Sequence, residues 1–171
     1  VVEDEIEAFG KHLSEKYNIK QSKLKTLNFE YDAYNVDIAM FRSEKYTGHS
    51  GLPSVTVGTF EADLWRRDFT INTAYVKMDA FMIRKLITGQ LDETCIFKAH
   101  PNFESDLRAQ TLRIVNKNAF LEDPTRLLRA VKYLTVLNLS FEAETEKLFL
   151  EATHLNIIEH CALGQIGRAH V

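Results

Sequence analysis

The chain has 171 residues, 45% of them hydrophobic and 26% charged, a composition typical of a globular domain with its own core. It contains no apolar run long enough to cross a membrane and no signal-peptide pattern, so we expect no membrane partner. Its two cysteines, Cys95 and Cys161, are too few and too far apart for a disulfide framework or a zinc site, which favours a reducing, cytoplasmic setting. Because the net charge is -3, any surface for RNA is local or lies in chain beyond this sequence.

The first third of the chain predicts one helix followed by strands. Over residues 3–17, apolar side chains follow helical spacing, with acids early and lysines late. Alternating patterns over residues 24–31 and 34–41 predict two strands joined by a turn. Two glycines and a proline indicate a loop at residues 47–53, before a short strand at 54–58.

A first motif, Asp-Leu-Trp-Arg-Arg-Asp-Phe-Thr-Ile-Asn, occupies residues 63–72. If this segment is helical, Asp68 and Asn72 share a face. A carboxylate beside an amide can read a sugar hydroxyl, because the first accepts hydrogen bonds and the second both donates and accepts them. The adjacent Arg66 and Arg67 can hold phosphate oxygens. The alternative is an ordinary surface helix with one acid–arginine pair at the same spacing, and these ten residues alone do not decide between the two.

A second motif, Leu-Glu-Asp-Pro-Thr-Arg-Leu-Leu-Arg-Ala, occupies residues 121–130 and predicts the start of a helix. Asp123 can cap this helix, and Pro124 suits its first position. An apolar stripe and a face with two arginines follow; the stripe is Leu127, Val131 and Leu134, and the other face carries Arg126, Arg129 and Tyr133. Such a helix can pack on one side and hold an anion or a base edge on the other.

Two helices are predicted beyond this point, over residues 125–137 and 142–155, as antiparallel neighbours joined by a short link. The expected buried face of the second helix is Thr145, Leu148, Phe149, Ala152 and Leu155. Two histidines and a cysteine follow closely, but their spacing fits no standard zinc pattern, and we assign no metal ligand in this chain.

Together, the two motifs resemble the signature of the class II tRNA nucleotidyltransferases, which are the CCA-adding enzymes and the related bacterial poly(A) polymerases. The motifs occur in the family's order and at its separation, and the resemblance runs from Val1 to about Leu155. It implies an α+β fold: a nucleotidyltransferase-like, mainly antiparallel sheet head, incomplete here, followed by all-α neck helices. We therefore expect a partial head domain at residues 1–118 and the start of a helical neck, an RNA-binding domain, at residues 119–165.

The resemblance implies a transferase that adds C and A, as CCA, to the 3′ end of tRNA or another RNA from CTP and ATP without a template. The terminal 3′-hydroxyl attacks the α-phosphorus and pyrophosphate leaves, while two Mg²⁺ ions reduce the charge cost at both oxygens. We expect their carboxylate ligands just before Val1, so this chain alone should not catalyse. These residues do not separate CCA addition from CC-only, A-only or poly(A) addition. The rival interpretations are a non-catalytic nucleotide- or RNA-binding module and an unrelated helical interaction domain.

The resemblance also implies roles for the motif residues. The acid and amide of the first motif face the ribose and favour a 2′-hydroxyl, and its arginines help to neutralise phosphates. Asp123 and Arg126 read the base edge, which cytosine and adenine share because both present an amine donor beside a ring-nitrogen acceptor. Glu122 orients Arg126, and Arg129 reaches phosphate or base.

Two further sets of residues enter through the same resemblance. Asp37 is either a third acid near the metal ions or an outward polar residue of an alternating strand. Arg42, Glu44 and Tyr46 match an element at the base of a mobile loop, which would be residues 47–53.

The final six residues, 166–171, equal the translation of ATC GGA AGA GCA CAC GTC, which resembles a short-read sequencing adapter. We interpret Ile-Gly-Arg-Ala-His-Val as an artefact of that origin and leave it out of the fold.

Overall fold

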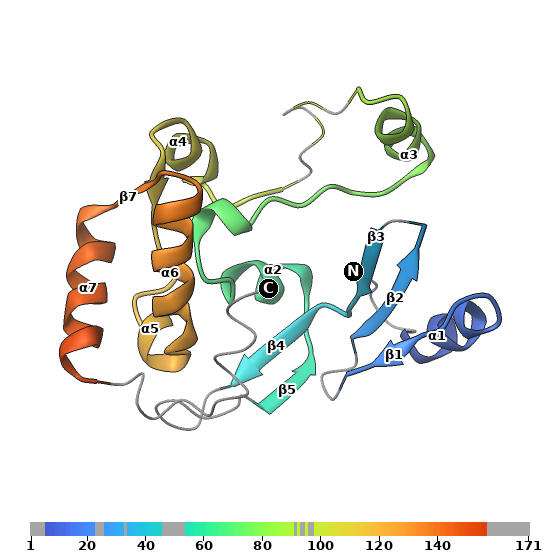
Figure 1. Ribbon diagram of the computed structural model, residues 1–171, viewed down its shortest axis with the longest axis horizontal. Coiled ribbons are helices and arrows are strands. Elements are labelled where there is room, and N and C mark those ends of the chain that lie inside the picture. Colours follow the sequence, from blue (N-terminus) through green and yellow to red (C-terminus); the bar gives the residue numbers. More distant parts are fainter. Residues whose placement is uncertain are drawn as a thin grey trace. The chain divides into compact units, whose positions relative to one another are not determined.

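The computed structural model describes residues 6–22, 26–32, 34–45, 54–90, 92, 95 and 98–156. The chain forms two compact units, and the boundary between them falls inside a helix, between Asp63 and Leu64. The first unit holds the described residues up to Lys45 and those from Ser54 to Asp63, and the second holds those from Leu64 onward. Helices mixed with small, mainly antiparallel sheets confirm the expected α+β class (Figure 1).

The first unit is built on a three-stranded antiparallel sheet with one helix against it. Ile6 and Leu27 are buried where this helix meets the sheet. A Cβ on Gly10 would lie 3.0 Å from Leu27 Cδ1, so the glycine lets the helix approach closely. The helix and both predicted strands are confirmed, with one short additional strand. The elements are α1 (Ile6–Ser14), β1 (Lys20–Gln21), β2 (Leu27–Tyr31) and β3 (Tyr34–Ile38).

A hairpin of β4 (Arg42–Lys45) and β5 (Ser54–Val57) follows, and β5 confirms the strand expected at this position. The predicted strand over residues 34–41 ends early, at Ile38, because the chain starts a new ladder at Arg42. The expected mobile loop at residues 47–53 lies outside the described residues. After the hairpin comes α2 (Phe60–Trp65), which contains the boundary between the two units.

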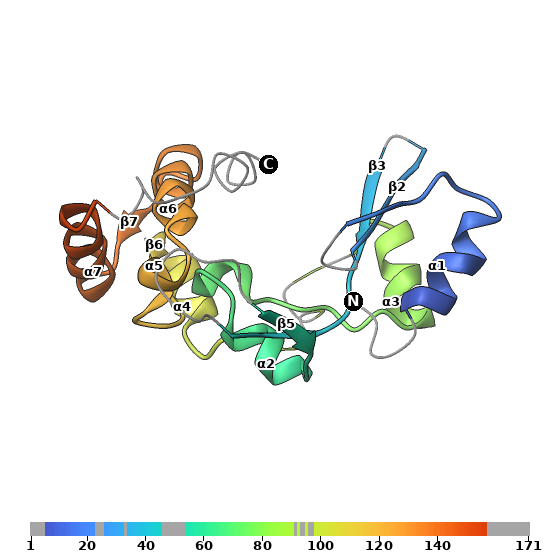
Figure 2. The ribbon, with the colours of Figure 1, turned by 90° about the horizontal axis from the view of Figure 1, so that it is seen from below.

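The second unit packs α5, α6 and α7 around one apolar core, and Figures 1 and 2 both show these helices side by side. The buried residues of this core are Phe69, Leu112, Ile114, Ala119, Phe120, Leu127, Ala130 and Ala152. The elements are η1 (Thr70–Asn72), α3 (Ala80–Ile87), α4 (Phe103–Arg108), β6 (Thr111–Leu112), α5 (Ala119–Glu122), α6 (Thr125–Val136), β7 (Ser140–Phe141) and α7 (Ala143–His154). No helix among the described residues combines the length and the apolar character needed to span a bilayer.

The two predicted neck helices are confirmed as α6 and α7, but two residues expected on their buried faces are exposed. Val131 is 50% exposed, because Leu127 and Ala130 centre the buried side of α6 and Val131 lies one step around the helix. Leu155 is 62% exposed, because it follows the last residue of α7, beyond the core.

The first motif is not one continuous helix, contrary to the helical expectation. Helix α2 ends at Trp65, and Phe69 has an extended backbone with φ -124° and ψ 150°. Phe69 pairs in antiparallel fashion with Ile114, and the Thr70 N–H donates to the Arg113 carbonyl at 2.9 Å. This long-range pairing ends the helix, and the fully buried Phe69 anchors the motif in the core.

An excursion of the second unit carries α3, in a segment for which the sequence favoured neither helix nor strand. Asp79 caps this helix by accepting a hydrogen bond from the Met82 N–H at 2.9 Å. The excursion is closed where Tyr75 and Lys98 form an antiparallel bridge, and α3 itself contains no buried residue.

Candidate functional site

The two motifs meet in the second unit through an ion pair between residues 61 positions apart. Arg129 Nε lies 2.6 Å from Asp68 Oδ2, and the Asp68 side chain is 9% exposed. Burial works against the charge on Arg129, but the Asp68 carboxylate outweighs it, so the pKa of this guanidinium is raised above its ordinary value. Arg129 therefore stays charged, and its contact with Asp68 joins α6 to the segment between α2 and η1.

Asp68 and Asn72 are in contact, although not through the helix that the spacing suggested. Asn72 Nδ2 donates to Asp68 Oδ1 at 2.9 Å, and the Phe69 N–H donates to the same oxygen at 2.8 Å. The contact forms because η1 turns the chain back toward Asp68 after the extended residue. The acid and the amide predicted to face a ribose thus lie together.

Tyr133 belongs to this cluster and was missing from the predicted site. Its hydroxyl oxygen accepts from Arg129 Nη2 at 2.8 Å and from Asn72 Nδ2 at 3.2 Å. Its ring stands edge-on to Phe69, with centroids 5.6 Å apart. The available signal was its position four residues after Arg129, on the face already noted for its arginines.

Arg126 does not project from an open face of α6 as expected, because it is only 6% exposed. Its Nη2 donates to the Arg66 carbonyl at 3.0 Å, and its Nη1 donates to the Ala119 carbonyl at 3.3 Å. One carbonyl from the preceding helix α5 and one from the first motif therefore draw this guanidinium inward. Glu122 Oε2 lies 3.8 Å from Arg126 Nη1, within reach to orient it.

Asp123 lies between α5 and α6 and is half-buried. Its Oδ1 accepts from the Thr125 N–H at 3.0 Å and from Thr125 Oγ1 at 2.6 Å, so it caps the start of α6 as expected. The helix begins at Thr125, one residue later than the proline-first prediction. Glu122 is held by Asn116, whose Nδ2 donates to its carboxylate at 3.0 Å.

The two arginines of the first motif have different surroundings. Arg66 presents its carbonyl to Arg126, whereas Arg67 Nε donates to the Tyr75 hydroxyl at 2.9 Å and its guanidinium lies 5.3 Å from the centre of that ring. Asp63, the acid of the alternative surface pair, is only 1% exposed and accepts from the Arg42 N–H at 3.4 Å. A plain solvated helix therefore does not describe this motif.

A buried hydrogen-bond network around Asp106 holds the first motif in place, and the sequence did not predict it. Asp106, 3% exposed, accepts from Thr70 Oγ1 at 2.8 Å and from Arg113 Nε at 2.9 Å. This bond to Asp106 raises the pKa of the Arg113 guanidinium, and Arg113 Nη1 also lies 3.4 Å from Glu142 Oε1. The network fixes Thr70, two residues after Asp68.

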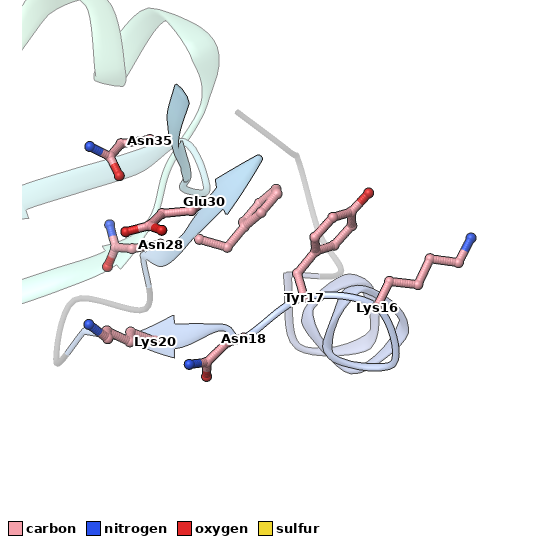
Figure 3. Close-up of a pocket in the computed structure, with 8 residues that line it drawn as sticks. Lys16, Tyr17, Asn18, Lys20, Asn28, Glu30 and Asn35 are labelled. Carbon is pink, nitrogen blue, oxygen red and sulfur yellow. The ribbon is translucent and has the colours of Figure 1, made fainter. Parts of the chain in front are cut away.

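In the first unit, Asp37 is exposed on β3, opposite Asn28 on β2, and its Oδ1 accepts from Asn28 Nδ2 at 2.5 Å. Asn28 also lines a pocket of about 400 Å³, into which Figure 3 shows polar side chains projecting from the sheet. The lining consists of Lys16, Tyr17, Asn18, Lys20, Asn28, Phe29, Glu30 and Asn35. Asp37 thus lies on the polar face of the sheet, where either interpretation of it places its carboxylate.

The mobile-loop residues are described only in part. Arg42 Nε and Glu44 Oε1 form an ion pair at 3.0 Å along β4, and the Glu44 side chain is 8% exposed. Tyr46 lies outside the described residues.

A metal ion is implied by the resemblance, but the described residues do not fit one. Among them, no three His, Cys, Asp or Glu side chains gather as a metal site would require. The one described candidate for a metal-side acid, Asp37, is paired with an amide instead. We therefore derive no reaction step through a metal.

Comparison with known proteins agrees with the fold and with the paired motifs. The profile of the family described as "Poly A polymerase head domain" matches residues 1–94, more than half of the chain. The A-adding tRNA nucleotidyltransferase of Geobacter sulfurreducens is 34% identical over 128 residues, which are 75% of this chain and 13% of that protein. The mitochondrial CCA tRNA nucleotidyltransferase of Saccharomyces cerevisiae is 30% identical over 135 residues, which are 78% of this chain and 22% of that protein.

A solved structure of a CCA-adding enzyme in an apo form shares the fold, with a TM-score of 0.75 and 22% identity over 98% of this chain and 38% of that one. Fold and motifs together define a nucleotidyltransferase-type head followed by the first helices of a neck. The chain belongs to the poly(A) polymerase head domain family, which confirms the resemblance drawn from its two motifs. It spans less than a quarter of the length of either curated relative.

Proposed function

We propose that this chain is the nucleotide-selecting part of a template-independent RNA nucleotidyltransferase that adds C and A to the 3′ end of tRNA from CTP and ATP. The reaction would be attack of the RNA 3′-hydroxyl on the α-phosphorus with release of pyrophosphate. Metal-ion catalysis by Mg²⁺ and a cytoplasmic location remain predictions from the sequence. Family membership supports the reaction type, and the names of both curated relatives support tRNA as the acceptor.

The observation that carries this proposal is the 2.6 Å contact between Arg129 Nε and Asp68 Oδ2. It brings the segment proposed to hold the sugar against the helix whose start is proposed to read the base. Binding a nucleotide across two elements orients its sugar relative to its base, and this positioning is the protein's main contribution to in-line phosphoryl transfer.

Base selection would use Asp123 and Arg126 at the start of α6. A carboxylate accepts from the exocyclic amine that cytosine and adenine share, and a guanidinium donates to the ring nitrogen beside it. Guanine and uracil present the reversed pattern. Arg126 is fixed by the Arg66 and Ala119 carbonyls, so its remaining N–H groups are held in one orientation. A guanidinium that is already fixed loses less rotamer entropy on binding than a mobile one, so it binds a base that presents a matching acceptor more tightly.

The alternatives within the family are A-only, CC-only and poly(A) addition. The Geobacter relative favours A-only addition as the second candidate, because it is named an A-adding enzyme and is 34% identical to this chain. The two candidates differ in whether CTP is bound as well as ATP.

The test is nucleotide binding by this chain and by Asp123→Asn, measured by calorimetric titration with CTP, ATP, GTP and UTP. Asparagine keeps an Oδ1 acceptor for the Thr125 cap, but it replaces the second oxygen with an amine that suits guanine and uracil. We expect the wild-type chain to prefer CTP and ATP. We expect Asp123→Asn to lose about tenfold in affinity for both, the value of one charge-assisted hydrogen bond.

The matched control is Asp79→Asn, another capping acid in the same unit, which accepts from the Met82 N–H at 2.9 Å. Selection of ATP alone by the wild type would replace the main candidate with A-only or poly(A) addition. Equal binding of all four nucleotides, or of none, would refute the proposal. An equal effect of Asp79→Asn would refute the assignment of base reading to Asp123.

A further inference from the structure

The hydrogen bonds around Asp68 leave its carboxylate little capacity for a ligand. Oδ1 accepts from the Phe69 N–H at 2.8 Å and from Asn72 Nδ2 at 2.9 Å, while Oδ2 takes the 2.6 Å bond from Arg129. The residue is only 8% exposed. Asp68 therefore acts through its neighbours: its carboxylate orients the amide of Asn72 and the guanidinium of Arg129.

The orientation of the Asn72 amide follows from the same bonds. A carboxylate only accepts, so the group that faces Asp68 must be the amide nitrogen. The two hydrogens of that nitrogen serve Asp68 Oδ1 and the Tyr133 hydroxyl oxygen. Asn72 Oδ1 remains as an acceptor, and no partner within the described residues takes it up.

The Tyr133 hydroxyl still has its hydrogen to donate. Its oxygen accepts from Asn72 Nδ2 at 3.2 Å and from Arg129 Nη2 at 2.8 Å, and neither nitrogen can accept in return. The hydroxyl hydrogen must therefore point elsewhere, and no acceptor for it occurs in the described part of the chain. A phenol that receives two donors, one of them charged, is polarised and becomes a stronger donor itself.

We propose that Tyr133 joins Asn72, for which the resemblance already implies a place at the ribose, in reading the 2′-hydroxyl of the incoming nucleotide. The ribose hydroxyl donates to Asn72 Oδ1 and accepts from the Tyr133 O–H, and Asp68 is the positioning residue that holds this pair in place. A free donor and a free acceptor lie next to each other, as one hydroxyl requires, because the Asn72 amide contacts Tyr133 directly. This inference rests on the proposed nucleotide-binding function and names the sugar-specificity residues of that site.

The test is a double cycle that combines Tyr133→Phe with removal of the ligand's 2′-hydroxyl. Affinities for CTP and dCTP are measured by calorimetric titration for the wild-type chain and for the variant. Phenylalanine keeps the ring that stands edge-on to Phe69, so a thermal melt should show that the variant is folded. The matched control is Tyr34→Phe, which makes the same chemical change on a side chain that is 71% exposed in the first unit.

We expect Tyr133→Phe to weaken CTP about fivefold, as for one lost hydrogen bond, and to leave dCTP within about twofold of the wild type. Tyr34→Phe should change neither affinity. A merely structural role would weaken both ligands by the same factor, and that result would overturn the inference. Equal binding of CTP and dCTP by a wild-type chain that still prefers CTP and ATP over GTP and UTP would also overturn the inference, but it would leave the proposed function standing. A wild-type chain without that base preference would refute both the inference and the proposed function.

Discussion

The buried carboxylate of Asp106 offers the sharpest test of how the first motif is held. The perturbation is Asp106→Asn, which keeps the volume but removes the charge. Asp106 accepts from Thr70 Oγ1 at 2.8 Å and from Arg113 Nε at 2.9 Å, and its side chain is 4% exposed. Both partners contact Oδ2, and Arg113 Nε also lies 3.2 Å from Oδ1, so the amine of an asparagine must face the Arg113 guanidinium.

The magnitude follows from what each partner loses. Removing one member of a fully buried ion pair costs about 3–5 kcal/mol, and a single hydrogen bond to a charged group contributes about 1.5–3 kcal/mol. Arg113 is not fully buried, since its side chain is 32% exposed and it also faces Glu142. Water and Glu142 therefore recover part of the loss, and we expect a decrease of about 2–3 kcal/mol in the free energy of unfolding.

The assay is urea unfolding followed by the fluorescence of Trp65, the single tryptophan of the chain. Trp65 reports on the second unit, because its ring packs edge-on against His100 with centroids 5.0 Å apart. The matched control is Glu104→Gln on the same helix, where the pair with Arg108 is 3.5 Å long and both side chains are mostly exposed. We expect that control to change stability by less than about 0.5 kcal/mol. An Asp106→Asn loss no larger than the control's would refute the network.

Two further predictions concern the neck helices. Leu127→Ala should lower the free energy of unfolding by about 2–5 kcal/mol, because it empties part of the core. Val131→Ala on the same helix should cost less than about 1 kcal/mol, since this side chain is half exposed, and equal urea midpoints would contradict the assigned face. Glu142 caps α7. Burial alone would raise its pKa, but hydrogen bonds from the Thr145 and Glu144 N–H groups and the Thr145 hydroxyl, together with the charge of Arg113, lower this pKa below its ordinary value. The stability that the ionised Glu142 cap gives the folded chain is therefore fully present above the ordinary pKa of a glutamate. It is lost as the pH falls through the lower pKa that Glu142 has in the folded chain. Glu142→Gln should flatten the acid decline of the melting temperature, and an unchanged profile would exclude this cap as its source.

Local signals were enough to predict the neck helices and the first strands. Helices α6 and α7 are 12 residues each, with an apolar period and a polar cap at the start, and such features depend only on neighbours in sequence. Val131 and Leu155 were misjudged because a period identifies a stripe but neither its edge around the helix nor the residue at which the core stops. Leu155 continues the period of α7 after the core has ended.

The sequence was enough to identify most residues of the site, but not the contacts that they make. Asp68, Asn72 and Arg129 were identified from the motifs, and all three lie in one cluster. The break of the first motif at Phe69 could not be predicted, because it depends on pairing with Ile114, 45 positions away. Arg126 turned inward for a similar reason, since the carbonyls that hold it belong to other elements. The part of Tyr133 in the cluster depends on the position of Asn72, which only the folded chain provides.

The bridge between Tyr75 and Lys98 has a consequence for how this chain can change in length. The Tyr75 N–H donates to the Lys98 carbonyl at 2.8 Å, and the Lys98 N–H donates back at 3.4 Å, so both ends of the excursion are clamped together. Helix α3 contributes nothing to the core between these ends. Since the entropy of closing a loop grows only slowly with its length, evolution or an engineer could shorten, extend or replace α3 with little thermodynamic penalty, whereas the buried Cys95 further along would have to stay. Helix α3 is therefore a suitable place to graft a peptide or attach a reporter dye, whereas Tyr75 must be kept because its hydroxyl accepts from Arg67.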